Sequence, residues 1–184
     1  MALRVWCVAA LVLSGVPSVA RDPVASGPQA GERPGPYSFL VASGPERGQQ
    51  TCYVCETAEK PGVIVFARSV SDPLGRLMAA CDESIAHRPK DSMRAWMTVL
   101  GEKTIRLDEL GAWAKKQGLK SVPVGVFDDP VGPPSYKLSR DADVTVLLFV
   151  NRKVVFNATY RSGELNDAAV KRIGEEVARL AAKK

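Results

Sequence analysis

Residues 143–154 have the sequence DVTVLLFVNRKV, and this stretch carries the strongest structural signal in the chain. From Val144 to Val150 the residues are apolar except for Thr145, and most are β-branched or aromatic, which is typical of a strand buried on both faces. The pair Asn151-Arg152 follows as a short turn, and residues 153–157 form a second strand candidate. The stretch therefore predicts a β-hairpin.

Strand and helix signals alternate on the N-terminal side of this hairpin. Strands are expected over residues 37–42, 62–67 (GVIVFA), 94–100 (RAWMTVL) and 122–127. Helical spacing of apolar residues is found over residues 71–86, 104–117 and 164–182, with Ser162 expected to cap the last helix. Strands that alternate with helices predict a parallel sheet covered on both faces, and the terminal hairpin makes this sheet mixed.

The N-terminal residues have the features of a targeting segment. Residues 1–20 predict a secretory signal, because Arg4 precedes a short apolar run and residues 18–20 (SVA) fit the cleavage pattern. An uncleaved N-terminal anchor is the alternative. Residues 21–36 contain four prolines and little apolar surface, so we expect a flexible leader. Residues 37–184 then form one α/β domain, exported to a periplasm or the extracellular space, with no membrane span after cleavage.

The charge balance bounds the class of partner. The whole chain carries 25 basic and 20 acidic residues, for a net charge of +5, and removal of Arg4 with the signal leaves +4. Charges of both signs are interspersed, which argues against a nucleic-acid partner. No cofactor is expected from the sequence.

The hairpin stretch also resembles a known family. Residues 143–154 are similar to the thioredoxin-like signature in which Pro-Thr leads into an apolar strand, a tight turn and a second strand. Residues 122–127 and the loop after them resemble an insertion of the redoxin and peroxiredoxin branch. The resemblance implies a three-layer sandwich with a mixed central sheet and flanking helices.

The chain departs from this family at two places. The family has its reactive cysteine at the start of the helix after the first buried strand, and residues 67–73 (ARSVSDP) contain no cysteine. The family's cis-proline is replaced by Val144, for which a trans bond is expected. The resemblance implies an altered groove formed by Ser69, Ser71, Asp72, Val144 and Thr145.

Cys52 and Cys55 form a C-x-x-C pair ahead of the strand at 62–67. Such a pair can be a displaced redox pair, a structural disulfide, or part of a metal site that recruits Cys81 or His87. Lys60 and Arg68 are candidates for lowering a thiol pKa, if they fold back near the pair.

Cys81 lies on the apolar side of its predicted helix. It is expected to be a buried small hydrophobic residue, or a resolving thiol if the cysteine segment folds over that helix. The sequence thus predicts a thiol-disulfide oxidoreductase acting on a protein or peptide partner. The alternative is a non-catalytic binding module in which Cys52 and Cys55 form a structural disulfide.

Overall fold

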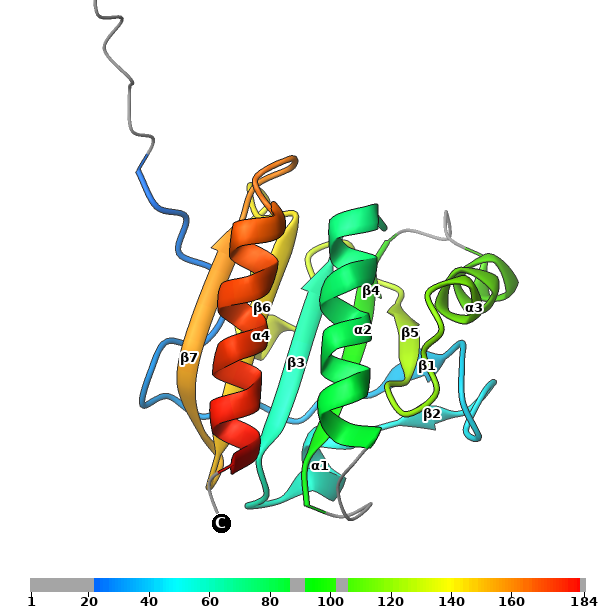
Figure 1. Cartoon of the computed structure of the whole chain (residues 1–184), viewed down its shortest axis with the longest axis horizontal. Coiled ribbons are helices and arrows are strands. Elements are labelled where there is room, and N and C mark those ends of the chain that lie inside the picture. The colour runs from blue at the N-terminus through cyan, green and yellow to red at the C-terminus, as the bar shows by residue number, and fades with distance from the viewer. Residues whose placement is uncertain (1–21, 87–91, 102–105, 183–184) are drawn as a thin grey trace, which may run out of the picture.

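The computed structural model describes residues 22–86, 92–101 and 106–182, so the predicted signal peptide and His87 lie outside the described residues. The described elements follow the chain as β1 (Phe39–Val41), β2 (Gln50–Thr51), α1 (Tyr53–Thr57), β3 (Gly62–Ala67), α2 (Asp72–Ala86), β4 (Arg94–Leu100), α3 (Leu107–Lys116), β5 (Val124–Phe127), the 3-10 turn η1 (Pro134–Tyr136), β6 (Val144–Val150), β7 (Lys153–Tyr160) and α4 (Asp167–Ala182). Figure 1 shows these elements around one sheet.

The strands of the described residues form a mixed sheet in the order β2-β1-β5-β4-β3-β6-β7. β3 pairs in parallel with β4 and antiparallel with β6, and β6 pairs with β7 as the predicted hairpin. Ala67 lies opposite Val144 at one end of β3, and Gly62 lies opposite Phe149 at the other. The predicted α/β class and mixed central sheet are confirmed.

Helices α2 and α4 lie side by side over one face of the sheet (Figure 1). Every residue of β3 is buried, because this face packs against the helices and the opposite face packs against other segments. Leu74, Leu77 and Met78 of α2 belong to the same hydrophobic cluster as Ile173 and Val177 of α4. Leu110 and Ala114 join α3 to this cluster, so the longer helices share one face.

The opposite face carries a cluster of aromatic side chains. Tyr37, Phe66 and Trp96 lie within it, and the Tyr37 hydroxyl accepts a hydrogen bond from Trp96 Nε1 at 2.8 Å. Tyr53 of α1 and Tyr136 of η1 pack into the same cluster. This third layer is built from α1, η1 and extended chain rather than from long helices.

Residues 22–36 differ from the flexible leader that the sequence predicts. Ser26 is buried, and its hydroxyl lies 2.8 Å from Thr145 Oγ1. Asn157 Nδ2 donates to the carbonyl oxygens of Ser26 and Pro28. The segment is held by polar contacts with the sheet, and these compensate for its lack of apolar side chains.

The helix boundaries follow local capping. Ser71 Oγ accepts a hydrogen bond from Leu74 N at 3.3 Å, which confirms the predicted start of α2. The predicted cap of the last helix is wrong: Asn166 Oδ1, rather than Ser162, accepts from Ala169 N at 3.0 Å. α4 therefore begins three residues later than expected.

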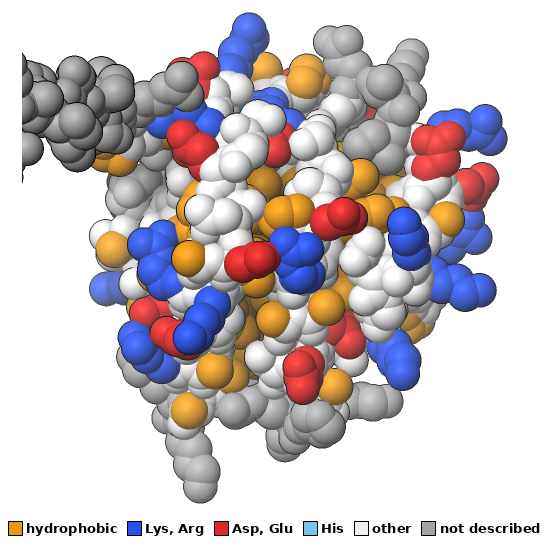
Figure 2. Space-filling model, turned by 45° about the horizontal axis from the view of Figure 1, so that its top comes forward, with side chains coloured by type: hydrophobic (Ala, Val, Ile, Leu, Met, Phe, Trp, Pro, Cys, Tyr) orange, Lys and Arg blue, Asp and Glu red, His pale blue; other side chains and the backbone are white. Residues whose placement is uncertain are grey.

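Basic and acidic side chains alternate over the helical face (Figure 2). Two ion pairs link separate elements there, Arg76 with Asp167 at 2.6 Å and Arg47 with Asp108. No described helix is long and apolar enough to cross a membrane.

Candidate functional site

The C-x-x-C pair forms a disulfide across the short helix α1. The Cα atoms of Cys52 and Cys55 are 5.4 Å apart. Cys52 immediately precedes the helix, and its Sγ accepts a hydrogen bond from Cys55 N at 3.3 Å. The cysteine segment is thus a short helical turn.

Tyr53, which lies between the two cysteines, anchors this helix. Its side chain is only 2% exposed, and its ring centroid lies 5.5 Å from that of Phe39 and 5.8 Å from that of Trp96. The Arg94 guanidinium lies 5.6 Å from the Tyr53 ring centroid and forms an ion pair with Glu56 at 2.6 Å. α1 is therefore fixed to the aromatic face through side chains other than the cysteines.

The two sulfur-bearing residues differ in exposure. Cys55 is exposed, whereas Cys52 is half-buried. Cys55 also lines a cavity of about 370 Å³, together with Arg33, Pro34, Gly35, Pro36, Val54, Ala58, Phe149 and Arg152. An incoming thiol can therefore approach Cys55 more readily than Cys52.

The pair lies at the amino end of β3. α1 leads into Gly62, and the cavity residue Phe149 is the partner of Gly62 on β6. Ala67 and Val144 mark the other end of the same strands, about 16 Å away at 3.3 Å per residue. The disulfide and the start of α2 therefore occupy opposite ends of the sheet (Figure 1).

Solved structures show which fold this arrangement belongs to. The chain is similar to a candidate protein disulfide isomerase from Bacteroides thetaiotaomicron, with 16% identity, coverage of 88% of this chain and 96% of that one, and a TM-score of 0.65. A candidate thiol:disulfide interchange protein DsbE from Chlorobium tepidum matches with 13% identity, coverage of 84% and 99%, and a TM-score of 0.56. A secreted Mycobacterium tuberculosis disulfide oxidoreductase homologous to E. coli DsbE matches with 8% identity, coverage of 79% and 94%, and a TM-score of 0.52.

The chain has a thioredoxin-like fold. The thioredoxin-like fold that the sequence suggested is confirmed. The sequence matches no protein-family model, and it matches no curated protein. At these low identities the fold is shared, and the activity has to be argued from this chain's own residues.

At the start of α2, where thioredoxin-like proteins carry their reactive cysteine, this chain has serines that form structural hydrogen bonds. Ser71 caps α2, and Ser69 Oγ donates to the Asp143 carboxylate at 3.0 Å. No described peptide bond is cis, so the bond before Val144 is trans, as expected. Thr145 bonds Ser26 on the opposite face. The structure does not bring these groove residues together with Cys52 and Cys55.

Arg68 also belongs to this end of the sheet. Its guanidinium donates to the carbonyl oxygens of Ala142 and Ser139, each at 2.9 Å, and to that of Pro130. Burial lowers the pKa of this guanidinium. Arg68 holds the loop between β5 and β6 and does not approach the disulfide, so its suggested effect on a thiol pKa is wrong.

Cys81 packs between α2 and the sheet, within the helical layer. Its side chain is fully buried. α1 packs on the other face through Tyr53, so the sheet separates Cys81 from the disulfide and the suggested resolving role has no geometric basis. The described residues contain no group of three or more potential metal ligands, and His87, which the metal alternative also invoked, lies outside them.

The burial of Cys81 gives a testable expectation. Burial raises the pKa of its thiol from 9.0 to about 12, and the Asp82 carboxylate adds to this rise. The folded state then holds the proton that the unfolded state releases, so this contribution to stability is complete below pH 9 and is lost as the pH rises towards 12. We expect Cys81 to resist iodoacetamide in the folded protein and to react on unfolding.

The pH dependence of stability gives a second expectation. As the pH is raised from 8 to 10, we expect a Cys81→Ala variant to lose less stability than the native protein.

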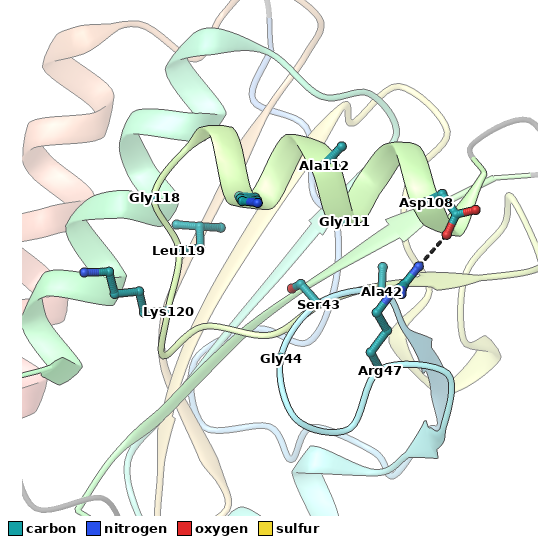
Figure 3. Close-up of a pocket in the computed structure, with 11 residues that line it drawn as sticks. Ala42, Ser43, Gly44, Arg47, Asp108, Gly111, Ala112, Gly118, Leu119 and Lys120 are labelled. Atoms are coloured by element: carbon teal, nitrogen blue, oxygen red, sulfur yellow. Dashed lines mark hydrogen bonds and ion pairs between the residues drawn. The ribbon is translucent and has the colours of Figure 1, made fainter.

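A second cavity, of about 470 Å³, lies between α3 and the loop after β1 (Figure 3). Its lining includes Gly111, Lys120 and the ion pair of Arg47 with Asp108. None of the cysteines and none of the predicted groove residues line it. Of these two cavities, the one next to Cys55 adjoins the disulfide.

Sequence reasoning missed the partners of Cys55 in its cavity. Arg33 lies in the segment expected to be flexible, Arg152 in the hairpin turn, and Phe149 in a strand assigned to the core. Arg33 precedes Cys55 by 22 residues in the sequence, and Arg152 and Phe149 follow it by 97 and 94 residues.

Proposed function

We propose that this chain is a thiol-disulfide oxidoreductase that exchanges disulfides with a protein partner through Cys52 and Cys55. The observation that supports the proposal is the difference between the two sulfurs. Cys55 is exposed and lines a cavity, whereas Cys52 is half-buried and accepts a backbone hydrogen bond. The likeness to disulfide oxidoreductase structures is consistent with this function at the level of the fold.

The greater exposure of Cys55 supports an order for the proposed exchange. A partner thiolate attacks Sγ of Cys55, a bond forms between those two sulfurs, and the Cys52–Cys55 bond breaks. The electron pair goes to Cys52 Sγ, where the N–H of Cys55 already donates a hydrogen bond and stabilises the thiolate that leaves. A second thiolate of the partner then attacks its own sulfur in the mixed disulfide and releases Cys55. The partner dithiol is oxidised, and Cys52 and Cys55 are reduced and take up its two protons.

A purely structural role explains less of the site. The disulfide closes a ring that spans a sequence separation of 3, and loop-closure entropy gives such a ring about 2 kcal/mol. α1 is already held by Tyr53 and by the ion pair of Arg94 with Glu56. A structural disulfide adds little stability to a helix that is anchored in this way.

The compartment is part of the proposal. The expected signal at residues 1–20 directs the chain out of the cytosol. In the compartment outside, disulfides persist and an oxidoreductase meets exported substrates. The partner is an exported protein dithiol or disulfide.

Two measurements test the proposal. The reduction potential of the pair, measured against glutathione, is expected to lie within the range of cellular thiol buffers. Reduced Cys52→Ser protein, given glutathione disulfide, is expected to accumulate a mixed disulfide on Cys55 at least about tenfold faster than Cys55→Ser protein accumulates one on Cys52. Mass spectrometry of the intact protein gives both rates, and the Cys52→Ser, Cys55→Ser double variant is the control.

Two other results would contradict the proposal, the first as a whole and the second in the order of attack. A potential below about −300 mV would place the pair among structural disulfides. Equal trapping rates for the two single variants would remove the assigned order while leaving exchange itself in place.

A further inference from the structure

We propose that the cavity beside Cys55 binds an extended peptide segment in which the reacting cysteine is flanked by an acidic residue. This inference rests on the proposed function and specifies the substrate class of the same site. Two arginines, Arg33 and Arg152, and no carboxylate are found among the residues that line the cavity. A cavity with cations beside the reactive sulfur favours a partner of negative charge.

Both arginines are available for a partner. Their side chains are exposed, and neither has a hydrogen-bond or ion-pair partner among the described residues. Glu56, the acidic neighbour of Cys55 in sequence, is already paired with Arg94 at 2.6 Å. The positive charge at the cavity is therefore not neutralised by that carboxylate.

The backbone holds both arginines on ordered segments. Gly31 N donates to Val154 O at 2.8 Å, and Val154 N donates to Glu32 O at 2.9 Å, which places the residue before Arg33 along β7. Asn151 N donates to Glu59 O at 2.8 Å, which fixes the hairpin turn next to the segment after α1. The N-terminal segment and the hairpin turn, which are distant in sequence, thus each contribute one arginine to the cavity beside Cys55.

The conformation of Arg152 is a second, independent observation. Asn151 and Arg152 form the hairpin turn with φ values of 52° and 58°. Asparagine suits the first position of such a turn, but the second strongly favours glycine, because a side chain is strained there. A glycine would make the turn more easily, so the arginine adds a charge at the expense of local backbone strain.

The rest of the lining favours a peptide. Val54, Phe149 and Pro36 add apolar surface to the cavity, which complements an aliphatic or aromatic side chain next to the acidic residue. Pockets of this kind combine apolar walls with a few placed polar groups. Glutathione also carries carboxylates, so it is the competing source of the same chemistry.

The experiment measures the rate at which reduced peptides open the Cys52–Cys55 disulfide. The probes are one cysteine peptide with flanking glutamates, the same peptide with flanking glutamines, and glutathione. We expect the glutamate peptide to react about tenfold faster than the glutamine peptide at low salt, and the difference to shrink in 0.5 M NaCl. We expect glutathione to react more slowly than the glutamate peptide, because it lacks the flanking side chains that reach the apolar walls.

Charge variants test whether Arg33 and Arg152 cause the preference for the glutamate peptide. The Arg33→Gln, Arg152→Gly double variant is expected to fold, because both residues are exposed and glycine suits the turn. It should lose the preference for glutamate, so that the glutamate and glutamine peptides react with the variant at equal rates. Lys115→Gln, Lys171→Gln is the matched control, since it removes the same charge from exposed positions on α3 and α4, and it should keep the preference.

The outcomes separate this inference from the function on which it rests. Equal rates for the glutamate and glutamine peptides, with the disulfide still opening, overturn the acidic-peptide inference alone. Glutathione reacting as fast as the glutamate peptide also overturns it, in favour of a small anionic thiol. A disulfide that none of the thiols opens, including dithiothreitol, overturns the inference together with the proposed function.

Discussion

Replacing Asp82 by alanine is expected to lower the free energy of unfolding by about 3 kcal/mol or more. Asp82 lies on α2 and is buried. Its Oδ1 accepts hydrogen bonds from three consecutive backbone amides, those of Lys120, Ser121 and Val122, at 2.9, 2.6 and 2.8 Å. Alanine leaves these donors without an acceptor in the segment that enters β5, and an unsatisfied buried donor costs about 1–3 kcal/mol.

Urea denaturation followed by circular dichroism measures this loss. Asp82→Asn keeps a carbonyl oxygen of the same shape and is expected to retain most of the stability. Glu83→Ala is the matched control, because it removes a carboxylate from an exposed position on the same helix and should change stability by less than about 0.5 kcal/mol. A loss for Asp82→Ala no larger than that of Glu83→Ala would show that water satisfies the three amides.

The sheet could be predicted from sequence because its central strands are buried on both faces. β3, β4 and β6 have the expected bounds, since a largely apolar run of six or seven residues has few alternatives. The start of α2 was equally clear, because Ser71 gives a local signal that needs no tertiary information. Asp82 gave no such signal: its three partners lie 38 to 40 residues further along the chain.

The candidate site could be predicted only in part. The C-x-x-C motif was visible, but α1 is five residues long and has no periodicity to detect. Residues 22–36 were expected to be flexible because burial was judged from apolar side chains. Their contacts, such as the hydrogen bond of Ser26 with Thr145, are polar. Arg33 lies in that segment, and the sequence predicts Arg152 only as part of the hairpin turn.

Under the proposed function, the reactive pair lies at the opposite end of the sheet from the one that the resemblance implied. At the carboxyl end of β3, Arg68, Ser69 and Ser71 are engaged in hydrogen bonds that close a loop and cap a helix. At the amino end, a short helix presents the exposed residue Cys55 in a cavity that also contains two arginines with no ion-pair partner among the described residues. A thioredoxin-like scaffold places rigid strands at both ends, so either end can support a reactive pair.

Tyr53 gives the second large effect, and it distinguishes an anchored redox helix from a stapled one. We expect Tyr53→Ala to lower the free energy of unfolding by about 3–5 kcal/mol, as for other buried aromatic residues. The ring is 2% exposed and contacts Phe39, Trp96 and the Arg94 guanidinium. The Cys52→Ser, Cys55→Ser double variant is expected to lose only about 2 kcal/mol, because its ring closes little chain.

The comparison of these variants is made by urea denaturation under oxidising conditions, with Tyr53→Phe as the control. Tyr53→Phe keeps the ring and loses only the hydrogen bond to Glu46, so it should cost about 1 kcal/mol. If α1 is anchored by Tyr53, the disulfide is free to open and close while the helix stays docked, and Tyr53→Ala is the most damaging change. A double cysteine variant that lost more stability than Tyr53→Ala would mean that the disulfide holds the helix in place, which is the behaviour of a staple rather than of a redox centre.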